Sequence, residues 1–500
     1  MDKRKSLLNI IVSILFKVIL VILSIFVKRE LVINLGNEVN GLNSLFMSII
    51  GVLSVAELGV GTSIIFCMYK PIVEGDDKKV SALYGLYKKV YILISIVILL
   101  FGLLLLPFLK YFVRDLEQIS FNIYISFILM IVAVCITYLF SAKISLINAY
   151  KNKYVTTIIN STGLIVQYLL QLLVIFILRS YYFYLIVIII SSLIQWIMTD
   201  LYTNKHYKKI ITVKCKIDTS TKCEVSQKVR AMFIHKIGEV LVNTIDSVII
   251  STFVGVIILG KYSNYIAIMS SMVGLISLFF TPLTSIIGHT LIKESKESVK
   301  SLYNSLHFIN FCIGCIFFFG YYSIIDNIII LLFGKELILS NAISFTITVN
   351  YFVQFMRYST LLFRDASGTF YNDRFKPIVE GVLNLVLSII FVNVVGVVGV
   401  IVSTIITNLF ICHIIEPYVL HKNALGISPK KFYMKNYLYI FIFILLLMVI
   451  DVVHINIQNV WIELLVNGSV SVVISLTICI LFYIFNKKIK NDIKFLLKGK

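Results

Sequence analysis

The sequence predicts an all-α polytopic membrane protein with about fourteen transmembrane helices, and three observations support this prediction. Of the 500 residues, 59% are hydrophobic and only 14% are charged, whereas soluble domains are about half apolar and a quarter charged. Apolar windows long enough to cross a bilayer, about 20 residues each, recur along the whole chain. Lys and Arg residues gather in alternate connecting segments, which is the pattern of a multi-pass protein.

The apolar windows follow one another from the first residues to the last. The first window comes after the basic start Met1–Lys5 and has no small-residue cleavage site, so we interpret it as a retained helix and not as a signal peptide. The fourteen windows lie near residues 9–27, 41–66, 90–109, 120–142, 156–178, 181–202, 231–252, 263–288, 304–325, 341–361, 377–394, 396–416, 436–453 and 462–485.

The distribution of basic residues predicts the orientation. With the N-terminus inside, the inner segments hold 36 of the 45 Lys and Arg residues and the outer loops hold 7. Cytoplasmic loops carry such an excess, so both termini are expected in the cytoplasm. The net charge of +20 is then an orientation signal, and we expect no nucleic-acid partner. The outer loops are short and leave no room for an external catalytic domain.

The longest polar stretch, residues 203–228, lies between the sixth and seventh windows. We therefore expect an N-terminal six-helix bundle over residues 1–202 and a cytoplasmic linker over 203–230. A second six-helix bundle should occupy residues 231–420. Residues 421–500 should add two helices and a basic cytoplasmic tail.

A short internal repeat favours this division into related halves. The same residue types recur in the same order at an offset of 224 residues, namely Leu35, Gly36 and Asn40 in the first half and Leu259, Gly260 and Asn264 in the second. Transporters built from two bundles often keep such internal similarity.

Motifs of common enzymes and metal sites are missing from the sequence. It contains no P-loop, H-E-x-x-H or G-x-S-x-G motif. Cys312 and Cys315 form a C-x-x-C pair, but it lies in an apolar window without a second pair at zinc spacing. We interpret these cysteines as helix-packing residues. The sequence thus predicts a protein that is not an enzyme and that carries no metal or cofactor.

Several windows carry ionisable residues, each of which costs about 2.5–3.5 kcal/mol at the bilayer centre and therefore tends to face a cavity or a partner. In the seventh window, spacings of 3, 4 and 3 place four polar residues on one helical face, namely Lys236, Glu239, Asn243 and Asp246. Lys17 lies centrally in the first window, and Glu57 precedes Leu58 and Gly59 near a possible helix break. Such faces predict a shared hydrophilic cavity.

Polar residues in further windows extend the candidate site. Gln167 lies in the fifth window, Arg357 and Arg364 lie in and after the tenth, and Asn384 lies in the eleventh. Other interpretations stay open for each. Arg357 could mark only the membrane interface, Gln167 and Asn384 could be interhelical hydrogen-bond partners, and Lys236 with Glu239 could form an intrahelical ion pair. Pro282 should kink the eighth window.

Motifs in both halves resemble one family of membrane transporters. Residues 35–46 read LGNEVNGLNSLF and residues 53–61 read LSVAELGVG, while the second half contains TIDSVII at 244–250, GKYSNY at 260–265 and FRDASG at 363–368. Together they resemble bacterial polysaccharide-export flippases of the Wzx type, which belong to the multidrug/oligosaccharidyl-lipid/polysaccharide (MOP) superfamily. The resemblance covers nearly the whole chain.

The resemblance implies a fold, a cargo and a cellular setting. The fold is two six-helix bundles around a central cavity plus two C-terminal helices, as in MATE transporters and MurJ. The cargo is an undecaprenyl-diphosphate-linked oligosaccharide, moved from the inner to the outer leaflet of the bacterial plasma membrane for capsule, exopolysaccharide or O-antigen synthesis. The movement uses alternating access coupled to a gradient of H⁺ or Na⁺. Membrane lipids and the glycan polymerase and glycosyltransferases of the same pathway are the implied partners.

Given this resemblance, we expect Lys17, Lys236 and Arg357 to bind the anionic head group of the cargo. Arg364, Gln167 and Asn384 complete the predicted substrate-binding set, and Glu57, Glu239 and Asp246 are the candidates for ion coupling. The sequence departs from the family in having few mid-membrane cations. A lipid II or teichoic-acid flippase and a MATE-like cation or drug antiporter are the alternatives, and a membrane glycan polymerase is a more distant one.

Overall fold

A computed structural model describes residues 3–57, 60–114, 117, 119–213, 215, 240, 244–280, 282–369, 372–450, 454–487 and 489–492. These residues are predominantly helical and contain no β-strand, which confirms the predicted all-α class. The chain forms two compact units, unit 1 over residues 1–263 and unit 2 over residues 264–500.

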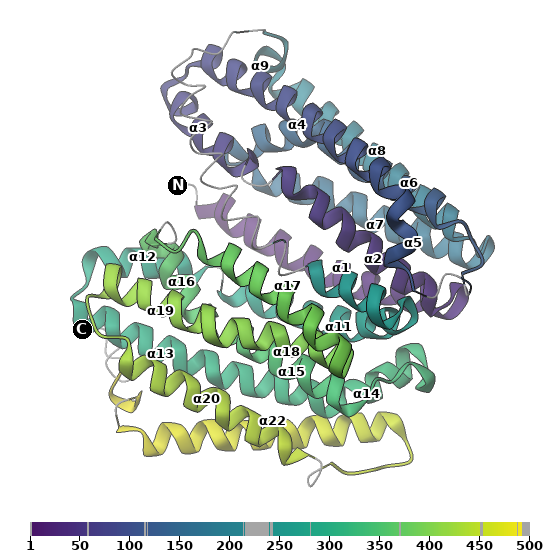
Figure 1. The fold of residues 1–500 in the computed structure, drawn as a ribbon. Helices are drawn as coiled ribbons and strands as arrows, with labels where there is room; N and C mark the ends of the chain where they lie inside the picture. The colour runs from purple at the N-terminus through teal and green to yellow at the C-terminus, as the bar shows by residue number, and fades with distance from the viewer. Residues whose placement is uncertain are drawn as a thin grey trace. The chain divides into compact units, whose positions relative to one another are not determined.

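Unit 1 is built from long helices joined by short turns (Figure 1). Within it, α6 packs against both α4 and α8, and α7 packs against α8 and α1. Its elements are α1 (Lys3–Leu35), α2 (Asn37–Leu53), η1 (Ser54–Glu57), α3 (Val60–Glu74), α4 (Asp77–Leu105), η2 (Leu106–Phe108), α5 (Leu109–Phe112), α6 (Ile123–Ala149), α7 (Lys153–Ile177), α8 (Tyr181–His206), α9 (Lys208–Thr212) and η4 (Ile250–Val254).

The boundary between the units falls inside α11 (Val256–Phe280). The other elements of unit 2 are α12 (Leu283–Lys293), α13 (Lys296–Gly314), η5 (Cys315–Phe319), α14 (Gly320–Phe333), η6 (Lys335–Leu337), α15 (Asn341–Met356), α16 (Tyr358–Ser367), α17 (Lys376–Val395), α18 (Val397–Thr407), η8 (Asn408–Cys412), α19 (His413–Leu420), η9 (His421–Leu425), α20 (Lys430–Met448) and α22 (Val460–Phe485). In this unit α17 packs along α18, α22 packs along α14, and α20 contacts α15 (Figure 1).

Ten helical segments of the described chain are long and apolar enough to cross a membrane. They coincide with ten of the predicted windows, and the exceptions are the first, second, seventh and tenth. The first window is covered by α1, which continues to Leu35 and therefore includes Lys28 and Arg29, two residues that the window limits assign to a loop. The seventh lies mostly outside the described residues, which contain only residue 240 and the end of the window, within Thr244–Val254.

The second and tenth windows are interrupted helices. The second is divided into α2, the short 3₁₀ turn η1 and α3, and the tenth is divided into α15 and α16 at Arg357. The eighth window also ends early, since α11 stops at Phe280 and α12 starts after Pro282. Non-helical backbone at membrane depth requires other groups to satisfy the freed hydrogen-bonding atoms. We therefore expect buried polar contacts at these breaks.

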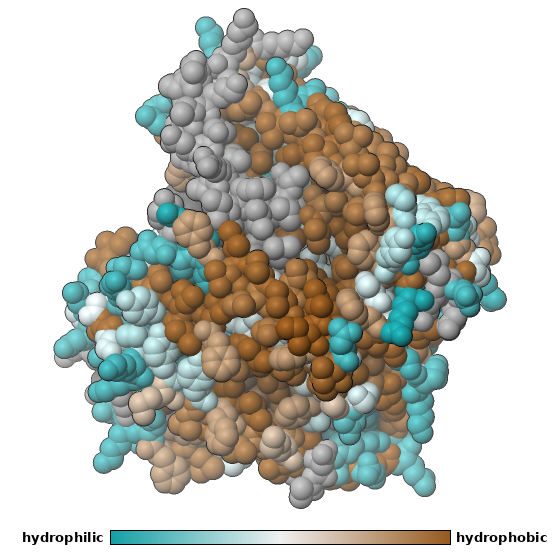
Figure 2. Space-filling view, in the orientation of Figure 1, coloured by the Kyte–Doolittle hydropathy of each residue, from teal (hydrophilic) through white to brown (hydrophobic). Residues whose placement is uncertain are grey.

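The flanks of the helices expose large apolar side chains. Figure 2 shows hydrophobic residues over much of the visible helix surface and hydrophilic residues gathered at chain turns and helix ends. Phe485 is 81% exposed and Phe279 is 78% exposed. A soluble monomer rarely exposes large continuous apolar patches, so this surface is suited to contact with lipid.

Residues of the first repeat copy contact the part of the second copy that lies in unit 1. Asn40 donates a hydrogen bond from its Nδ2 to the carbonyl of Gly260 at 2.9 Å. A Cβ atom on Gly41 would lie 2.0 Å from the carbonyl oxygen of Val256, and one on Gly260 would lie 2.3 Å from that of Asn37. The glycines therefore allow α2 and the first turns of α11 to approach at backbone distance.

The predicted domain limits stay predictions. Helix α8 extends to His206 and α9 follows it, so the predicted linker, residues 203–230, begins inside a helix. Most of the linker lies outside the described residues. Residues 244–263 belong to unit 1, although the sequence pattern assigns them to the second bundle.

Candidate functional site

The break in the second window places a carboxylate among tyrosines of unit 1. Glu57 ends η1, and its Oε1 accepts a hydrogen bond from the hydroxyl of Tyr91 on α4 at 3.4 Å. The hydroxyl of Tyr138 on α6 also hydrogen-bonds this carboxylate, and the rings of Tyr91 and Tyr138 stack with centroids 6.2 Å apart. Glu57, Tyr91 and Tyr138 form what we term the tyrosine–glutamate cluster.

A fourth residue, Tyr87, holds the start of α3 next to this cluster. Its hydroxyl donates to the carbonyl of Val60 at 2.9 Å and also hydrogen-bonds the carbonyl of Gly61. Tyr87 and Tyr91 are one helical turn apart on α4, with ring centroids 5.4 Å apart. Tyr87 therefore ties the first turn of α3 to α4 beside the break between α2 and α3.

No Lys or Arg forms an ion pair with Glu57 in the part of the chain that the structure describes. Its partners there are phenolic hydroxyls, which donate hydrogen bonds but carry no charge at neutral pH. A half-buried carboxylate in this setting can take up a proton or a small cation without first breaking a salt bridge. This is the chemistry that an ion-coupled step requires.

The break in the tenth window has a different composition. Arg357 separates α15 from α16, and its guanidinium donates to both carboxylate oxygens of Glu416 on α19, at 2.6 and 3.0 Å. Its third nitrogen donates to Asn408 Oδ1 at 2.6 Å. A two-pronged contact of this kind is the strongest geometry for an arginine and a carboxylate.

Further charged side chains surround the same glutamate. Lys376 on α17 lies 2.6 Å from Glu416 and 3.0 Å from Glu380. Arg364 on α16 lies 2.9 Å from Asp373 and 3.7 Å from Glu416. We term the six residues the charge cluster: Arg357, Arg364, Asp373, Lys376, Glu380 and Glu416.

The charge cluster is largely buried and electrically balanced, and the side chain of Arg357 is 16% exposed. Glu416 is only 1% exposed, and the three cations face three carboxylates. Buried ions are tolerated when each is paired and hydrogen-bonded, but removing one partner leaves an uncompensated charge. The arrangement therefore fastens α16, α17 and α19 together at the end of unit 2 that the predicted topology assigns to the cytoplasm.

Neighbouring side chains satisfy the backbone just before this break. His413 contacts the carbonyl of Val353 through Nε2 at 2.9 Å, and Asn310 Nδ2 donates to the carbonyl of Phe355 at 2.8 Å. Since an unsatisfied carbonyl within a bilayer costs several kcal/mol, these contacts stabilise the interrupted helix.

A π-helical segment presents the partners of Arg357. The element η8 (Asn408–Cys412) connects α18 to α19, and Asn408 is one of the groups that Arg357 contacts. Cys412, at the other end of η8, lies 3.3 Å from the ammonium of Lys376. Single π turns inside α-helices often occur at functional positions.

The other predicted site residues lie in several places. Lys17 is exposed on α1, and Gln167 is half-buried on α7. Asn384 is fully buried on α17, and its Nδ2 donates to Thr404 at 2.8 Å, which matches the interhelical alternative. Asp246 is half-buried within Thr244–Val254, whereas Lys236 and Glu239 lie outside the described residues.

The sequence singles out Arg357, Arg364 and Glu57 as candidates but does not reveal the partners that the structure gives them. Lys376 and Glu380 are visible as an i,i+4 pair at the start of a window, but the window limits assign Lys376 to a loop. Glu416 stands at the end of an apolar window, and its pairing spans 59 residues of sequence. Nothing in the sequence distinguishes Tyr91 and Tyr138 from the other tyrosines among the 28 in the chain.

Comparisons with known proteins identify the fold. No protein-family profile matches the sequence, and no curated protein matches it. An inward-facing multidrug resistance MATE transporter of the MOP superfamily superposes with a TM-score of 0.67 at 13% identity, covering 83% of this chain and 99% of that one. The lipid II flippase MurJ, in an inward closed conformation, gives a TM-score of 0.62 at 15% identity, covering 96% of this chain and 98% of that one.

A third structure extends the comparison. A MOP superfamily transporter from Pyrococcus furiosus superposes with a TM-score of 0.55 at 14% identity, covering 86% of this chain and 98% of that one. All three structures are transporters or flippases by their descriptions. The predicted MATE/MurJ-like fold is therefore confirmed: the chain has the fold of the MOP superfamily.

Proposed function

We propose that this protein is a flippase for undecaprenyl-diphosphate-linked oligosaccharides in the bacterial plasma membrane. The observation that carries the proposal is the extent of the structural match. The lipid II flippase covers 96% of this chain, whereas the MATE transporter and the Pyrococcus furiosus transporter cover 83% and 86%. This chain therefore exceeds the MATE transporter in length by about as much as the lipid II flippase does.

The last two transmembrane helices add to this support. Helix α22 packs along α14 and α20 contacts α15, so both are integral parts of unit 2 and not a loose extension. A cation or drug antiporter of this superfamily would stop after twelve helices, while a protein whose cargo carries a long lipid tail has use for additional membrane surface. A glycan polymerase would need a catalytic cluster on an outer loop, and the outer loops are short.

The predicted site residues have different roles in this proposal. Lys17, which is exposed on α1, and Lys236 attract the negatively charged diphosphate of the cargo. Gln167 supplies an amide for the sugars. Arg357 and Arg364 direct their charge to carboxylates of unit 2, so we assign them to holding the interrupted helix. Glu57 couples transport to H⁺ or Na⁺, together with Glu239 and Asp246.

Reconstitution tests the proposal directly. The purified protein would be placed in vesicles that contain an undecaprenyl-diphosphate-linked oligosaccharide labelled in its glycan. Flipping is measured as the fraction of glycan that becomes accessible to an added glycosidase, with protein-free vesicles as the control. We expect gradient-dependent exposure of the glycan. Exposure of lipid II alone, or efflux of ethidium without glycan exposure, would replace the proposal by the corresponding alternative.

A further inference from the structure

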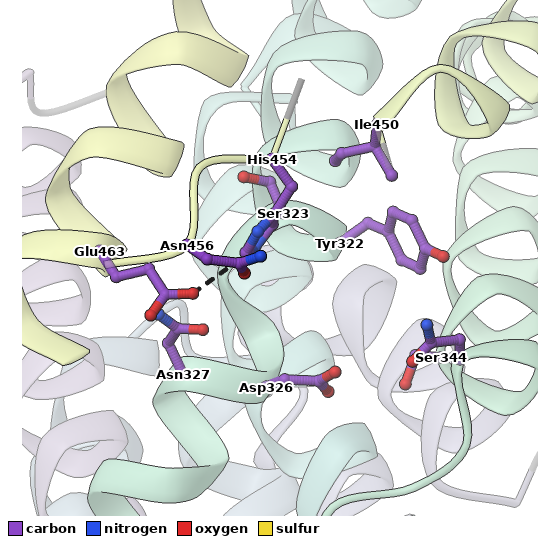
Figure 3. Close-up of a pocket in the computed structure, with 10 residues that line it drawn as sticks. Tyr322, Ser323, Asp326, Asn327, Ser344, Ile450, His454, Asn456 and Glu463 are labelled. Atoms are coloured by element: carbon purple, nitrogen blue, oxygen red, sulfur yellow. Dashed lines mark ion pairs between the residues drawn. The ribbon is translucent and has the colours of Figure 1, made fainter. Parts of the chain in front are cut away.

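Unit 2 contains a cavity at the end of α15 that is opposite to Arg357. Its volume is about 390 Å³, which falls within the range of small-ligand sites, about 300–1,000 Å³. The wall is made by the first half of α14, the start of α15, Ile450 after α20, the segment before α22 and the first turn of α22. Figure 3 shows Asn327, Asn456 and Glu463 on one side and Tyr322 and Ser344 on the other, with Asp326 between them.

The lining of this cavity is polar and acidic. Asp326 and Glu463 contribute carboxylates, Asn327, Asn341 and Asn456 contribute carboxamides, and no Lys or Arg is among the described lining residues. Carboxylates only accept hydrogen bonds, whereas carboxamides both donate and accept them. The cavity is therefore suited to a ligand rich in hydroxyl groups, neutral or positively charged, and it disfavours an anion.

One buried group in the wall lacks a partner. Asn327 is 6% exposed, and its Nδ2 makes no hydrogen bond in the described structure. Leaving a buried donor unsatisfied costs about 1–3 kcal/mol. A ligand that offers an acceptor to this amide would remove that cost.

The neighbouring side chains are held in place by contacts behind the wall. Asp326 accepts a hydrogen bond from the hydroxyl of Tyr265 at 2.7 Å. His454 lies 3.8 Å from Glu463 and 3.2 Å from Asn467, whose carbonyl accepts a hydrogen bond from Ser323 at 3.0 Å. A wall fixed in this way loses little entropy when a ligand binds.

We propose that this cavity binds a sugar ring, either neutral or bearing an amino group. The carboxylates of Asp326 and Glu463 accept from sugar hydroxyls, Asn327 donates to a ring or hydroxyl oxygen, and the ring of Tyr322 packs against the carbon face of the sugar. The inference rests on the proposed function in one respect: the predicted topology places the cavity at the outer end of unit 2, where the glycan of a flipped cargo emerges.

Binding of free sugars to the purified full-length protein in nanodiscs tests the inference. Glucose, N-acetylglucosamine, glucosamine and glucuronate would be compared by saturation-transfer difference NMR with titration. We expect the first three to bind and glucuronate to bind at least about tenfold more weakly, because two carboxylates repel it. Asn327→Leu should weaken sugar binding by about tenfold.

Two further variants keep the test decisive. Asn393→Leu makes the same change at an exposed position on α17 outside the cavity, and it should leave sugar binding unchanged. Asn456→Ala alters an exposed lining residue that folding does not need, and it should weaken binding severalfold even if the Asn327 variant unfolds.

The opposite results would overturn the inference. The inference fails if the wild-type protein binds no sugar. It also fails if the Asn327 and Asn456 variants bind sugar as strongly as the wild-type protein does, or if the cavity binds tetramethylammonium in place of sugars. Flipping of labelled cargo by a protein that binds no free sugar would leave the proposed function standing and remove the sugar site. Sugar binding without flipping would leave the sugar site standing and remove the proposed function.

Discussion

The helix breaks at Glu57 and Arg357 are both supported by side chains from other helices, but these side chains are neutral at the first break and charged at the second. Each break brings an ionisable residue into a predicted membrane window, and side chains from other helices hydrogen-bond backbone carbonyls beside each break. At Glu57 the supporting groups are neutral tyrosines. At Arg357 they are charged residues that balance one another.

The difference separates a residue that can change its charge from residues that cannot. A proton or cation that enters the tyrosine–glutamate cluster meets one carboxylate and no competing Lys or Arg among its described partners. In the charge cluster, protonation of Glu416 would release three buried cations from their shared partner, at a cost of several kcal/mol. We therefore expect coupling at the first break and mechanical stability at the second.

The largest expected effect follows from removing the shared carboxylate of the charge cluster. Glu416→Ala should lower the free energy of unfolding by about 3–5 kcal/mol, because it strands Arg357 and Lys376 in a buried site. Thermal unfolding of the purified protein in detergent would measure the change. Glu74→Ala, which removes an exposed i,i+4 pair with Lys70, is the matched control and should cost less than about 1 kcal/mol. Similar melting temperatures for both variants would contradict the stabilising role of the charge cluster.

The next effect concerns transport at the other break. Glu57→Gln retains acceptors for the tyrosine hydroxyls but loses the charge, so the fold should tolerate it. Gradient-driven flipping in vesicles should fall by about tenfold or more, equivalent to about 1.4 kcal/mol. If the Glu57→Gln variant still responds to the imposed gradient, Glu57 has no coupling role.

A smaller effect is expected from one hydrogen bond of the same cluster. Tyr91→Phe removes the donor to Glu57 while keeping the stacked ring, and because this hydrogen bond is long, at 3.4 Å, we expect it to contribute about 0.5–1.5 kcal/mol. The flipping rate should therefore change by about two- to tenfold, most clearly in its dependence on the gradient. Tyr111→Phe, at an exposed residue of α5, serves as the control, and equal rates for both variants would argue against the cluster.

The smallest effect should come from the exposed lysine of α1. Lys17→Ala should leave the melting temperature unchanged, since the side chain is exposed, and should reduce flipping of a diphosphate-linked cargo severalfold at low salt. Lys17→Arg should preserve most of the rate. Loss of flipping in the Arg variant as well would show that charge is not the property that matters.

The sequence is sufficient for the fold class, because apolar windows and loop charges depend only on local composition. It also points to Glu57, since the Leu58 and Gly59 that follow it suggest a break, and it points to Arg357 as an ionisable residue near a window. It could not reveal that Glu416, 59 residues away from Arg357, neutralises it, because that contact depends on how α15, α16 and α19 fold together. Lys376 stands one residue before its predicted window, and its burial likewise depends on contacts that local composition does not show.

The π-helical segment η8 makes the length of the chain as important as its composition at this site. Because Asn408, at its start, and Glu416, after its end, both contact Arg357, the number of residues between them sets the rotation of α19. Each residue of an α-helix turns the chain by about 100°, so deleting one residue within 408–412 would swing Glu416 about a quarter-turn away from the cations. Amino-acid exchanges on the outer face of η8 leave that angle untouched. Single-residue insertions and deletions are therefore the changes that this segment tolerates least.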